Sequence, residues 1–366
     1  MTLFEADDVR TLPGECGSHT FMYRGAGLAG LRRAFNRDNI AAKIHHRALR
    51  WDEGPEQYVW GYHYLPPAEQ TPLIEALTIQ NVYAALGLAP RVYGLATWQD
   101  EFGQRHPVQV TEDLGCCDWG QPPQLAYDLF DRIVQLAGEY GFIAPGRDSG
   151  VHNYVAGKWV DFNGFRFGPD YYQQLMDRFW RGTQWGDRPY QQVLQGSLRN
   201  TCRDMQVRIT DLGLDRLDFS PRHVLDVGCS GGQFLNYLNR QYGARGTGYD
   251  TPRAVLSAAE FSATAGAWNV DYYSADLREQ DAVEGQYDLV LFLSVSRHIG
   301  LPEYVKQCAS KRLIIEAHDE HREAIEPWLG DEFEIVHQQV SVDYGRRVYH
   351  AERRTNGREV NVGRAV

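Results

Sequence analysis

The stretch HVLDVGCSGGQFLNYLNRQYG (223–243) decides the fold of the C-terminal half of the chain. It begins with an apolar run, continues through the glycine-rich turn DVGCSGG (226–232) and then shows apolar residues at helical spacing up to a glycine. Glycines between a strand and a helix let the backbone approach a ligand closely and direct helix N–H groups toward it. We therefore expect a ligand-binding loop at the end of a buried strand.

Three more strand-like runs follow the loop: RGTGYD (245–250), YDLVLFLS (287–294) and RLIIEAH (312–318). The second of them is apolar enough to be buried on both faces. Strands that alternate with helical segments predict βαβ units and a parallel sheet. Asp250 lies 22 residues after Gly228 at the end of a strand, where a carboxylate can accept hydrogen bonds from ribose hydroxyls. Asp276 in SADL (274–277) is a candidate partner for an adenine amino group.

These motifs, in this order, resemble those of the class I S-adenosylmethionine-dependent methyltransferases, across about residues 205–352. The resemblance implies that the first loop holds the methionine part of the methyl donor, that Asp250 holds its ribose and that the SADL turn holds its adenine. The donor-binding residues that it implies are Gly228, Ser230, Gly232, Asp250, Asp276, Leu277 and Ser294. An NAD-binding Rossmann unit is the alternative, but GCSGG lacks the GxGxxG spacing of such units.

The segment SVSRHIG (294–300) follows the apolar strand and lies where the sulfonium of the donor is expected. It resembles methyltransferases that act on phosphate oxygens, including RNA terminal-phosphate enzymes. Such an acceptor is already anionic, so it requires cationic groups and positioning more than a general base. The candidates for this role are Arg297, His298 and His318, with Tyr344 and Arg346 as weaker ones. The alternative is that His318 caps a strand end and that the arginines are solvated.

The N-terminal half carries a second constellation in GRDSGVHNYVAGKWVDFNGF (146–165). Asp148 precedes Asn153 by five residues, and Asp161 opens DFNG eight residues later. This is the spacing of the protein-kinase catalytic loop and of the metal-binding turn that follows it. Asp148 can orient and deprotonate an attacking hydroxyl, while Asn153 and Asp161 can hold magnesium ions against phosphates.

Upstream, RGAGLAG (24–30) is predicted to form a hairpin loop that covers phosphates. Its GxGxxG glycines are Gly25, Gly27 and Gly30. Lys43 falls on the following strand, where it can position the α- and β-phosphates of a nucleotide. Glu75 lies in a helix predicted at 72–86, from which it can pair with Lys43.

These elements resemble the eukaryotic-type protein-kinase fold across residues 17–190. Within that fold they are more similar to small-molecule kinases, such as the aminoglycoside and choline kinases, than to kinases that act on proteins. The resemblance implies ATP and Mg²⁺ as cofactors. Gly146 replaces the histidine usual before RD, Asn163 replaces the glycine of DFG, and no APE-like segment follows. These departures favour a glycan or small-molecule hydroxyl acceptor over a peptide. A pseudokinase is the alternative.

The predicted architecture has two domains, an α+β bilobal protein-kinase-like fold over residues 1–190 and an α/β Rossmann-like class I methyltransferase sheet over residues 191–354, with a tail at 355–366. The combination of a kinase-like and a methyltransferase domain resembles the bifunctional kinase–methyltransferases that cap polymannose O-antigen chains in Gram-negative bacteria. The order of the two domains in this chain is the reverse of the order in that family. The resemblance implies that the kinase phosphorylates a hydroxyl of a glycan or small molecule and that the methyltransferase then methylates this phosphate or a nearby group. Three alternatives stay open: separate modifications of a metabolite or antibiotic, modification of an RNA end, and a nucleotide-binding module that regulates the methyltransferase.

Composition sets the class of protein. The 366 residues carry a formal net charge of −11, and 43% of them are hydrophobic, which is typical of a globular chain. No apolar run approaches the roughly 20 residues that cross a bilayer, and the start MTLFEADDVR lacks the pattern of a signal peptide. The six cysteines form no CxxC pair. We therefore predict a cytoplasmic protein without membrane insertion, and the acidic balance disfavours nucleic acid as a partner.

Overall fold

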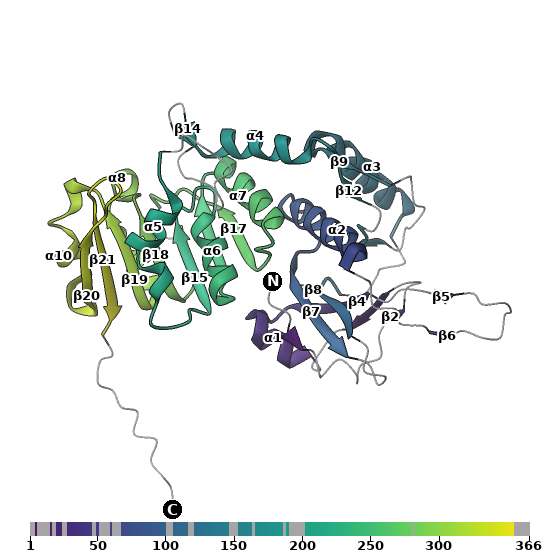
Figure 1. Cartoon of the computed structure of the whole chain (residues 1–366), viewed down its shortest axis with the longest axis horizontal. Helices are drawn as coiled ribbons and strands as arrows, with labels where there is room; N and C mark the ends of the chain where they lie inside the picture. The colour runs from purple at the N-terminus through teal and green to yellow at the C-terminus, as the bar shows by residue number, and fades with distance from the viewer. Residues whose placement is uncertain are drawn as a thin grey trace, which may run out of the picture.

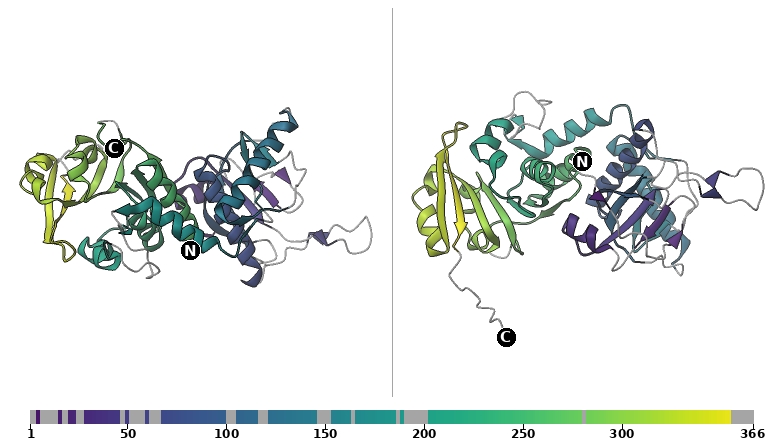
Figure 2. Two further views of the ribbon diagram at one scale, coloured as in Figure 1. Left: turned by 90° about the horizontal axis from the view of Figure 1, so that it is seen from above. Right: turned by 60° about the horizontal axis from the view of Figure 1, so that its bottom comes forward.

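A computed structural model describes two halves, each built on its own sheet (Figure 1). The described residues are 4–5, 15–16, 20–23, 28–45, 49–50, 59–60, 67–99, 105–115, 121–145, 153–162, 165–185, 188–189, 202–279 and 282–354. Figure 2 shows from two further directions that helices lie between the C-terminal sheet, in green to yellow, and the N-terminal sheet, in purple and blue. The boundary predicted at residue 190 falls in a stretch, 190–201, outside the described residues.

The C-terminal sheet has seven strands in the order β17-β16-β15-β18-β19-β21-β20. The first five of these are parallel: β17 (Val270–Ser274), β16 (Arg245–Asp250), β15 (His223–Val227), β18 (Tyr287–Leu293) and β19 (Ala309–Ala317). The other two close the edge as an antiparallel pair, β21 (Arg347–Arg353) and β20 (Phe333–Val340). The four predicted strands and the parallel sheet are confirmed, whereas β17 and the β20–β21 pair were not predicted.

Both faces of this sheet are covered because its strands are apolar on both sides. Along β18, Leu289 and Leu291 belong to one buried cluster, while Val290 and Phe292 belong to the cluster on the opposite face. The helices that alternate with the strands are α5 (Met205–Asp211), α6 (Gln233–Tyr242), α7 (Pro252–Thr264), α8 (Ser296–Ile299), α9 (Glu303–Cys308) and α10 (Ile325–Leu329). A Rossmann-like layer structure results.

The sequence predicts a longer helix before the first strand, over 197–214, than the structure contains. Residues 197–201 lie outside the described residues, and α5 begins only at Met205. The start is set by Asp204, whose carboxylate accepts hydrogen bonds from the backbone N–H groups of Gln206 and Val207 at 2.8 and 3.0 Å. Such N-caps satisfy backbone donors that a helix leaves unpaired at its first turn.

The N-terminal sheet has six strands in the order β1-β7-β8-β4-β3-β2. They are β1 (Phe4–Glu5), β7 (Val92–Gln99), β8 (Arg105–Glu112), β4 (Ile40–His45), β3 (Thr20–Tyr23) and β2 (Glu15–Cys16). All neighbours are antiparallel except β1 and β7. After β4 the chain forms the short pair β5 (Leu49–Arg50) and β6 (Val59–Trp60), and then the long helix α2 (Pro67–Ala85) leads into β7.

The predicted glycine-rich hairpin loop is wrong in its described part. Strands β3 and β4 are antiparallel neighbours, but the chain between them forms helix α1 (Ala29–Phe35), and Gly30 lies inside it. The physical reason is the four-residue spacing of Leu31 and Phe35, which buries both side chains on one face of the helix. Gly25 and Gly27 lie outside the described residues.

A set of helices and short strand pairs follows the N-terminal sheet. These elements are α3 (Pro123–Tyr140), β9 (Phe142–Ile143), β10 (Tyr154–Val155), β11 (Lys158–Trp159), β12 (Arg166–Phe167), α4 (Tyr171–Thr183), β13 (Gln184–Trp185) and β14 (Arg188–Pro189). The elements from α3 to α4 share with α2 an aromatic core in which Phe130 packs on Trp159 and Tyr83 stacks on Phe162. Strands thus dominate the first part of the N-terminal half and helices the second, and no described helix is both long and apolar enough to cross a membrane.

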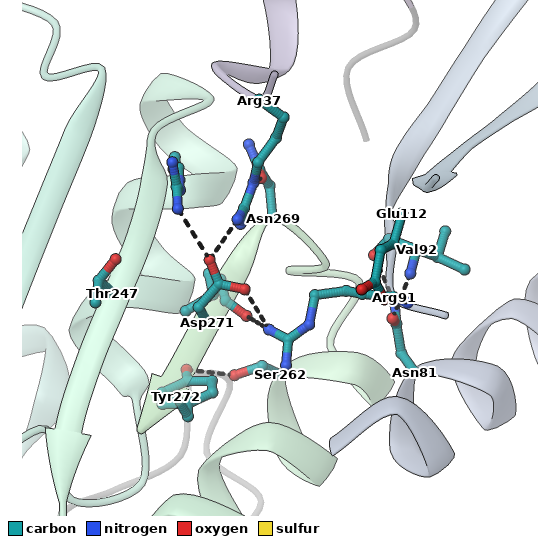
Figure 3. A network of polar contacts seen from close by, with 12 residues as sticks. Arg37, Asn81, Arg91, Val92, Glu112, Thr247, Ser262, Asn269, Asp271 and Tyr272 are labelled. Carbon is teal, nitrogen blue, oxygen red and sulfur yellow. Dashed lines mark hydrogen bonds and ion pairs between the residues drawn. The ribbon is translucent and has the colours of Figure 1, made fainter. Parts of the chain in front are cut away.

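A buried ionic network joins the two halves (Figure 3). The carboxylate of Asp271 on β17 pairs with Arg37 at 2.5 Å and Arg91 at 2.6 Å, both from the N-terminal half, and more distantly with Arg245. Asn269 adds two hydrogen bonds across the same boundary, one from Arg37 Nε and one to the backbone oxygen of Phe35. Burial opposes ionisation of Asp271, but the arginine charges outweigh it and hold the pKa of this carboxyl below its ordinary value.

Candidate active site

A cavity of about 1070 Å³ lies at the carboxyl ends of the parallel strands of the C-terminal sheet. Loops that follow parallel strands meet at this edge, which is where open α/β sheets bind ligands. Six of the seven residues implied as donor-binding line the cavity: Gly228, Ser230, Asp250, Asp276, Leu277 and Ser294. The seventh, Gly232, does not, because it lies at the N-cap of α6 against the ring of Tyr272.

The loop between β15 and α6 is shaped by residues with positive φ. Gly228 has φ of +78° and Ser230 has φ of +51°. A Cβ atom at Gly228 would lie 2.2 Å from Val295, so no side chain fits there. The backbone N–H groups of Gly228 and Cys229 both donate to the carbonyl of Tyr249, which ties the loop to the end of β16.

Asp250 is held at the cavity by two backbone hydrogen bonds. The N–H of Ser230 donates to one carboxylate oxygen at 2.7 Å, and the N–H of Thr251 donates to the other at 2.7 Å. Each oxygen keeps a further lone pair. The arrangement can therefore accept hydrogen bonds from a pair of neighbouring hydroxyl groups.

Asp276 lies at the exposed rim of the cavity. The side chain and backbone of Arg278 donate to its carboxylate, and these hydrogen bonds lower the pKa of Asp276 to about 2. The next residue, Leu277, lines the cavity, and its carbonyl accepts a hydrogen bond from Tyr304 at 2.7 Å. The turn is thereby tied to α9.

Asp226 is a functional candidate that the sequence analysis missed. It is buried just before Gly228, and its Oδ2 has no hydrogen-bond partner among the described residues. Burial and the neighbouring charge of Asp250 raise the pKa of Asp226 to about 7. The Asp226 side chain does not itself line the cavity, but it is a buried acceptor next in the chain to the glycine loop that does. The available signal was an acidic residue two positions before the first loop glycine.

Ser294 lines the cavity and is hydrogen-bonded to the buried Glu316, which does not line it. The hydroxyl of Ser294 donates to the carboxylate of Glu316, which also pairs with Arg203 and Arg208 at 2.5 Å each. Burial raises the pKa of Glu316, but the positive charges of the two arginines lower it by more, so this pKa lies below its ordinary value. Ser294 itself has φ of +62°. Its hydroxyl donates to Glu316 and can offer a ligand only its lone pairs.

Two of the three residues predicted to form a cationic cradle line the cavity. His298 and His318 both line the cavity, with ring centroids 6.3 Å apart. Burial and the positive charge of Arg346 lower the pKa of His318 to about 4, so its ring is neutral at neutral pH. Arg297 is exposed and does not line the cavity, which is a correction. Neighbours on a helix point about 100° apart, so α8 directs only one of Arg297 and His298 into the cavity.

Arg346 is better placed than the sequence indicates. It lines the cavity, and its Nη1 is buried without a hydrogen-bond partner among the described residues. Tyr344 also lines the cavity, donates to the backbone oxygen of Cys202 at 2.9 Å and lies under the guanidinium of Arg203. These contacts hold the β20–β21 connection against the segment before α5.

The N-terminal candidates are brought together only in part. Lys43 on β4 is partly buried, and burial lowers its pKa while the nearby charge of Asp161 raises it. The predicted ion pair between Lys43 and Glu75 is wrong, since no such pair exists among the described residues. Glu75 instead accepts a hydrogen bond from the backbone N–H of Phe167 at 3.2 Å, because its place on α2 faces β12.

Asn153 and Asp161 flank the β10–β11 hairpin, which turns at Ala156 and Gly157 with positive φ at both. The N–H of Val160 donates to the carbonyl of Asn153 at 2.9 Å, so the two ends of the hairpin lie side by side. Asp148 lies outside the described residues. The described part of the chain contains no group of three or more His, Cys, Asp or Glu side chains arranged to hold a metal ion.

The C-terminal half is similar in sequence to known methyltransferases. Residues 224–311 match the family model of the methyltransferase domain. The ubiquinone biosynthesis O-methyltransferase of Coxiella burnetii (strain RSA 493 / Nine Mile phase I) is 29% identical over 90 residues, which are 24% of this chain and 38% of that protein. The protein of the same name from Nitrosococcus oceani is 33% identical over 85 residues, or 23% of this chain and 36% of that one. The chain thus spans less than half the length of either relative.

Solved structures were compared as well. The magnesium protoporphyrin IX methyltransferase of Synechocystis PCC 6803 with bound SAM shares 24% identity, a TM-score of 0.35, and coverage of 41% of this chain and 78% of that one. Monomeric WbdD shares 20% identity, a TM-score of 0.34, and coverage of 44% and 45%. At these scores neither likeness adds to what the family model and the sheet order give. The C-terminal half therefore carries a class I S-adenosylmethionine-dependent methyltransferase domain.

Proposed function

We propose that this chain transfers a methyl group from S-adenosylmethionine to an acceptor in the C-terminal cavity. The observation that carries the proposal is the convergence of Gly228, Asp250 and Asp276 on that one cavity. When bound, the donor supplies a methyl group on a positively charged sulfonium. Asp250 then accepts hydrogen bonds from the ribose hydroxyls, and Asp226 accepts one from the ammonium group.

The acceptor in this proposal is an anionic oxygen, most simply that of a phosphate on a glycan or small molecule. Arg346 supplies the positive charge, because its buried Nη1 lacks a partner among the described residues. His298 and His318 position the acceptor by hydrogen bonds. The low pKa of His318 leaves it neutral at neutral pH, so it does not compete with Arg346 for the anion. An oxygen that is already anionic needs no general base.

The test uses the full chain, methyl-labelled S-adenosylmethionine and pairs of acceptors that differ only in one phosphate, such as mannose oligosaccharides and their phosphorylated forms. We expect label only on the phosphorylated members. The variant R346Q should raise the KM for the acceptor and leave donor affinity unchanged, whereas R297Q, at an exposed position, should change neither. Equal labelling of both members of a pair contradicts an anionic acceptor.

For the N-terminal half, the proposal is an ATP- and Mg²⁺-dependent kinase that supplies the phosphate. Three features support it: Lys43 lies on β4, an inner strand of the N-terminal sheet, it lies near the carboxylate of Asp161, and the hairpin joins Asn153 to Asp161. One observation favours the second candidate, a nucleotide-binding module that regulates methyl transfer. Glu75, which a kinase uses to hold its lysine, binds the backbone of Phe167 instead.

The two candidates separate in one experiment. The full chain and the variant D161N are incubated with ATP, Mg²⁺, labelled methyl donor and an unphosphorylated acceptor, and ADP and labelled product are measured. A kinase gives ADP and label with the wild type only, and D161N still methylates an acceptor that is phosphorylated beforehand. Label without ATP contradicts the sequential scheme, and no ADP with any acceptor supports the regulatory module.

A further inference from the structure

The helix α4 belongs to the N-terminal half of the chain but ends in the cavity of the C-terminal half. It extends from beside α3 across α7 (Figure 1). Gly182, Thr183 and Gln184 at its end line the cavity together with the glycine loop. Neither the methyltransferase motifs nor the matched residues 224–311 include this helix.

One face of α4 is buried along its whole length. The buried side chains are Tyr171, Leu175, Phe179 and Thr183, which repeat every four residues. The helix lies antiparallel to α7, since the hydroxyls of Tyr171 and Thr264 are 2.6 Å apart and Gly182 lies against Ser257. A Cβ atom at Gly182 would lie 1.6 Å from the Ser257 hydroxyl, so the Ser257 side chain packs directly against the backbone of α4 there.

An ion pair fixes α4 in this position. Arg178 donates to both carboxylate oxygens of Glu260 on α7, at distances from 2.5 to 3.1 Å. Its Nη2, which bonds Glu260, also donates to the backbone oxygen of Tyr140 at the end of α3, and the ring of Tyr140 lies under the guanidinium. Arg178 therefore ties the helical part of the N-terminal half to the helix that begins right after Asp250.

Phe179 extends this contact to the glycine loop. Its ring is buried, packs on Phe261 with centroids 4.8 Å apart, and lies against Gly231. A Cβ atom at Gly231 would lie 2.6 Å from two carbons of that ring. Gly231 follows Ser230, whose N–H holds Asp250. A residue from one half thus supports the backbone that shapes the proposed donor site in the other.

We infer that α4 is part of the methyl-donor site and that Phe179 is a positioning residue for the glycine loop. Donor affinity then depends on the docking of the N-terminal half, and the C-terminal domain alone is an incomplete site. The inference rests on the proposed donor binding. Wild-type protein that binds no donor would defeat the proposed function, whereas equal binding by wild type and a Phe179 variant would defeat this inference alone.

The first experiment measures the affinity of the full chain for S-adenosylhomocysteine by calorimetry. We expect F179A to bind about tenfold more weakly than the wild type, because the loop backbone loses its support. The matched control is F130A, at an equally buried phenylalanine of the same half that packs on Trp159. It loses similar packing and should keep the wild-type affinity. Circular dichroism and thermal unfolding verify that each variant is folded, and F179L replaces F179A if the latter does not fold.

A double-mutant cycle distinguishes direct support of the glycine loop by Phe179 from a general loss of packing in the protein. G231A introduces a methyl group into the ring of Phe179 and should weaken binding on its own. In the variant that combines G231A with F179A the methyl group has room, so its affinity should exceed the value expected from adding the two free-energy changes. Additive changes, or wild-type affinity in F179A and F179L, overturn the inference.

Discussion

The cavity of the C-terminal sheet and the Lys43 region of the N-terminal sheet were both predicted from short motifs, yet the structure treats them differently. In the first, residues far apart in the sequence converge because each follows a parallel strand that ends at the same edge. In the second, Lys43 lies near Asp161, whereas Glu75 binds Phe167 and Gly30 lies in a helix. A site whose members follow neighbouring parallel strands is fixed by topology, while one assembled from two lobes depends on how those lobes pack.

The largest effect is expected at the interface between the two halves, in the ionic network around Asp271. D271N removes the charge that Arg37 and Arg91 share, and it leaves two arginines facing each other in a buried interface. Removal of one partner from a buried pair typically costs about 3 kcal/mol or more. We expect the free energy of unfolding in urea to fall by that amount, with the two halves unfolding in separate transitions. A single transition with an unchanged midpoint would show that the network does not couple the halves.

The next largest effect is expected at the donor edge. D250A removes the acceptor for the Ser230 N–H and for the donor ribose, so affinity for S-adenosylhomocysteine should fall by about 100-fold. The matched control is D288N, near the start of β18 and so at the edge of the sheet opposite the cavity. There the Asp288 carboxylate pairs with Lys311 and accepts hydrogen bonds from the backbone N–H groups of Arg222 and His223. D288N should reduce stability and leave the affinity unchanged. Equal losses in both variants would contradict the assigned edge.

A smaller effect concerns pH. The pKa of Asp226 is about 7 in the folded chain against an ordinary value of 3.8, so between these values the folded state holds a proton that the unfolded state has lost. Its contribution to stability therefore falls as pH rises from about 4 to about 7 and then levels off.

An ammonium group next to Asp226 would favour the carboxylate. Donor binding near pH 6 should then release protons, as measured by calorimetry in buffers of different ionisation enthalpy. D226N should abolish the release. Identical proton release from wild type and D226N would assign the effect to another group.

The smallest effect tests the helix that replaces the predicted phosphate loop. Gly30 lies inside α1, so G30A should raise the free energy of unfolding by about 0.5 kcal/mol, since alanine loses less backbone entropy in a helix. Affinity for ATP should not change. Loss of ATP affinity in G30A would restore the original interpretation of RGAGLAG.

Much of the C-terminal half was predictable because its signals are local. The apolar runs, the glycine turn and Asp250 each indicate their place within a few residues of sequence. Strand β17 was missed because polar Asp271 and Tyr273 interrupt its apolar character, and the reason for Asp271 lies in arginines of the other half. Arg297 was wrongly preferred over Arg346 because sequence proximity to a motif does not reveal which face of a short helix meets the cavity.

The sequence by itself determined a parallel sheet with a donor loop and a second constellation in the N-terminal half, because hydrophobic periodicity and turn chemistry act over short stretches of chain. Tertiary structure alone decided that Oδ2 of Asp226 lacks a hydrogen-bond partner among the described residues, that Arg346 lines the cavity and that Phe179 packs against Gly231. These relations arise only when segments far apart in the sequence pack together, since burial and close contact are properties of the packed chain and not of any one segment.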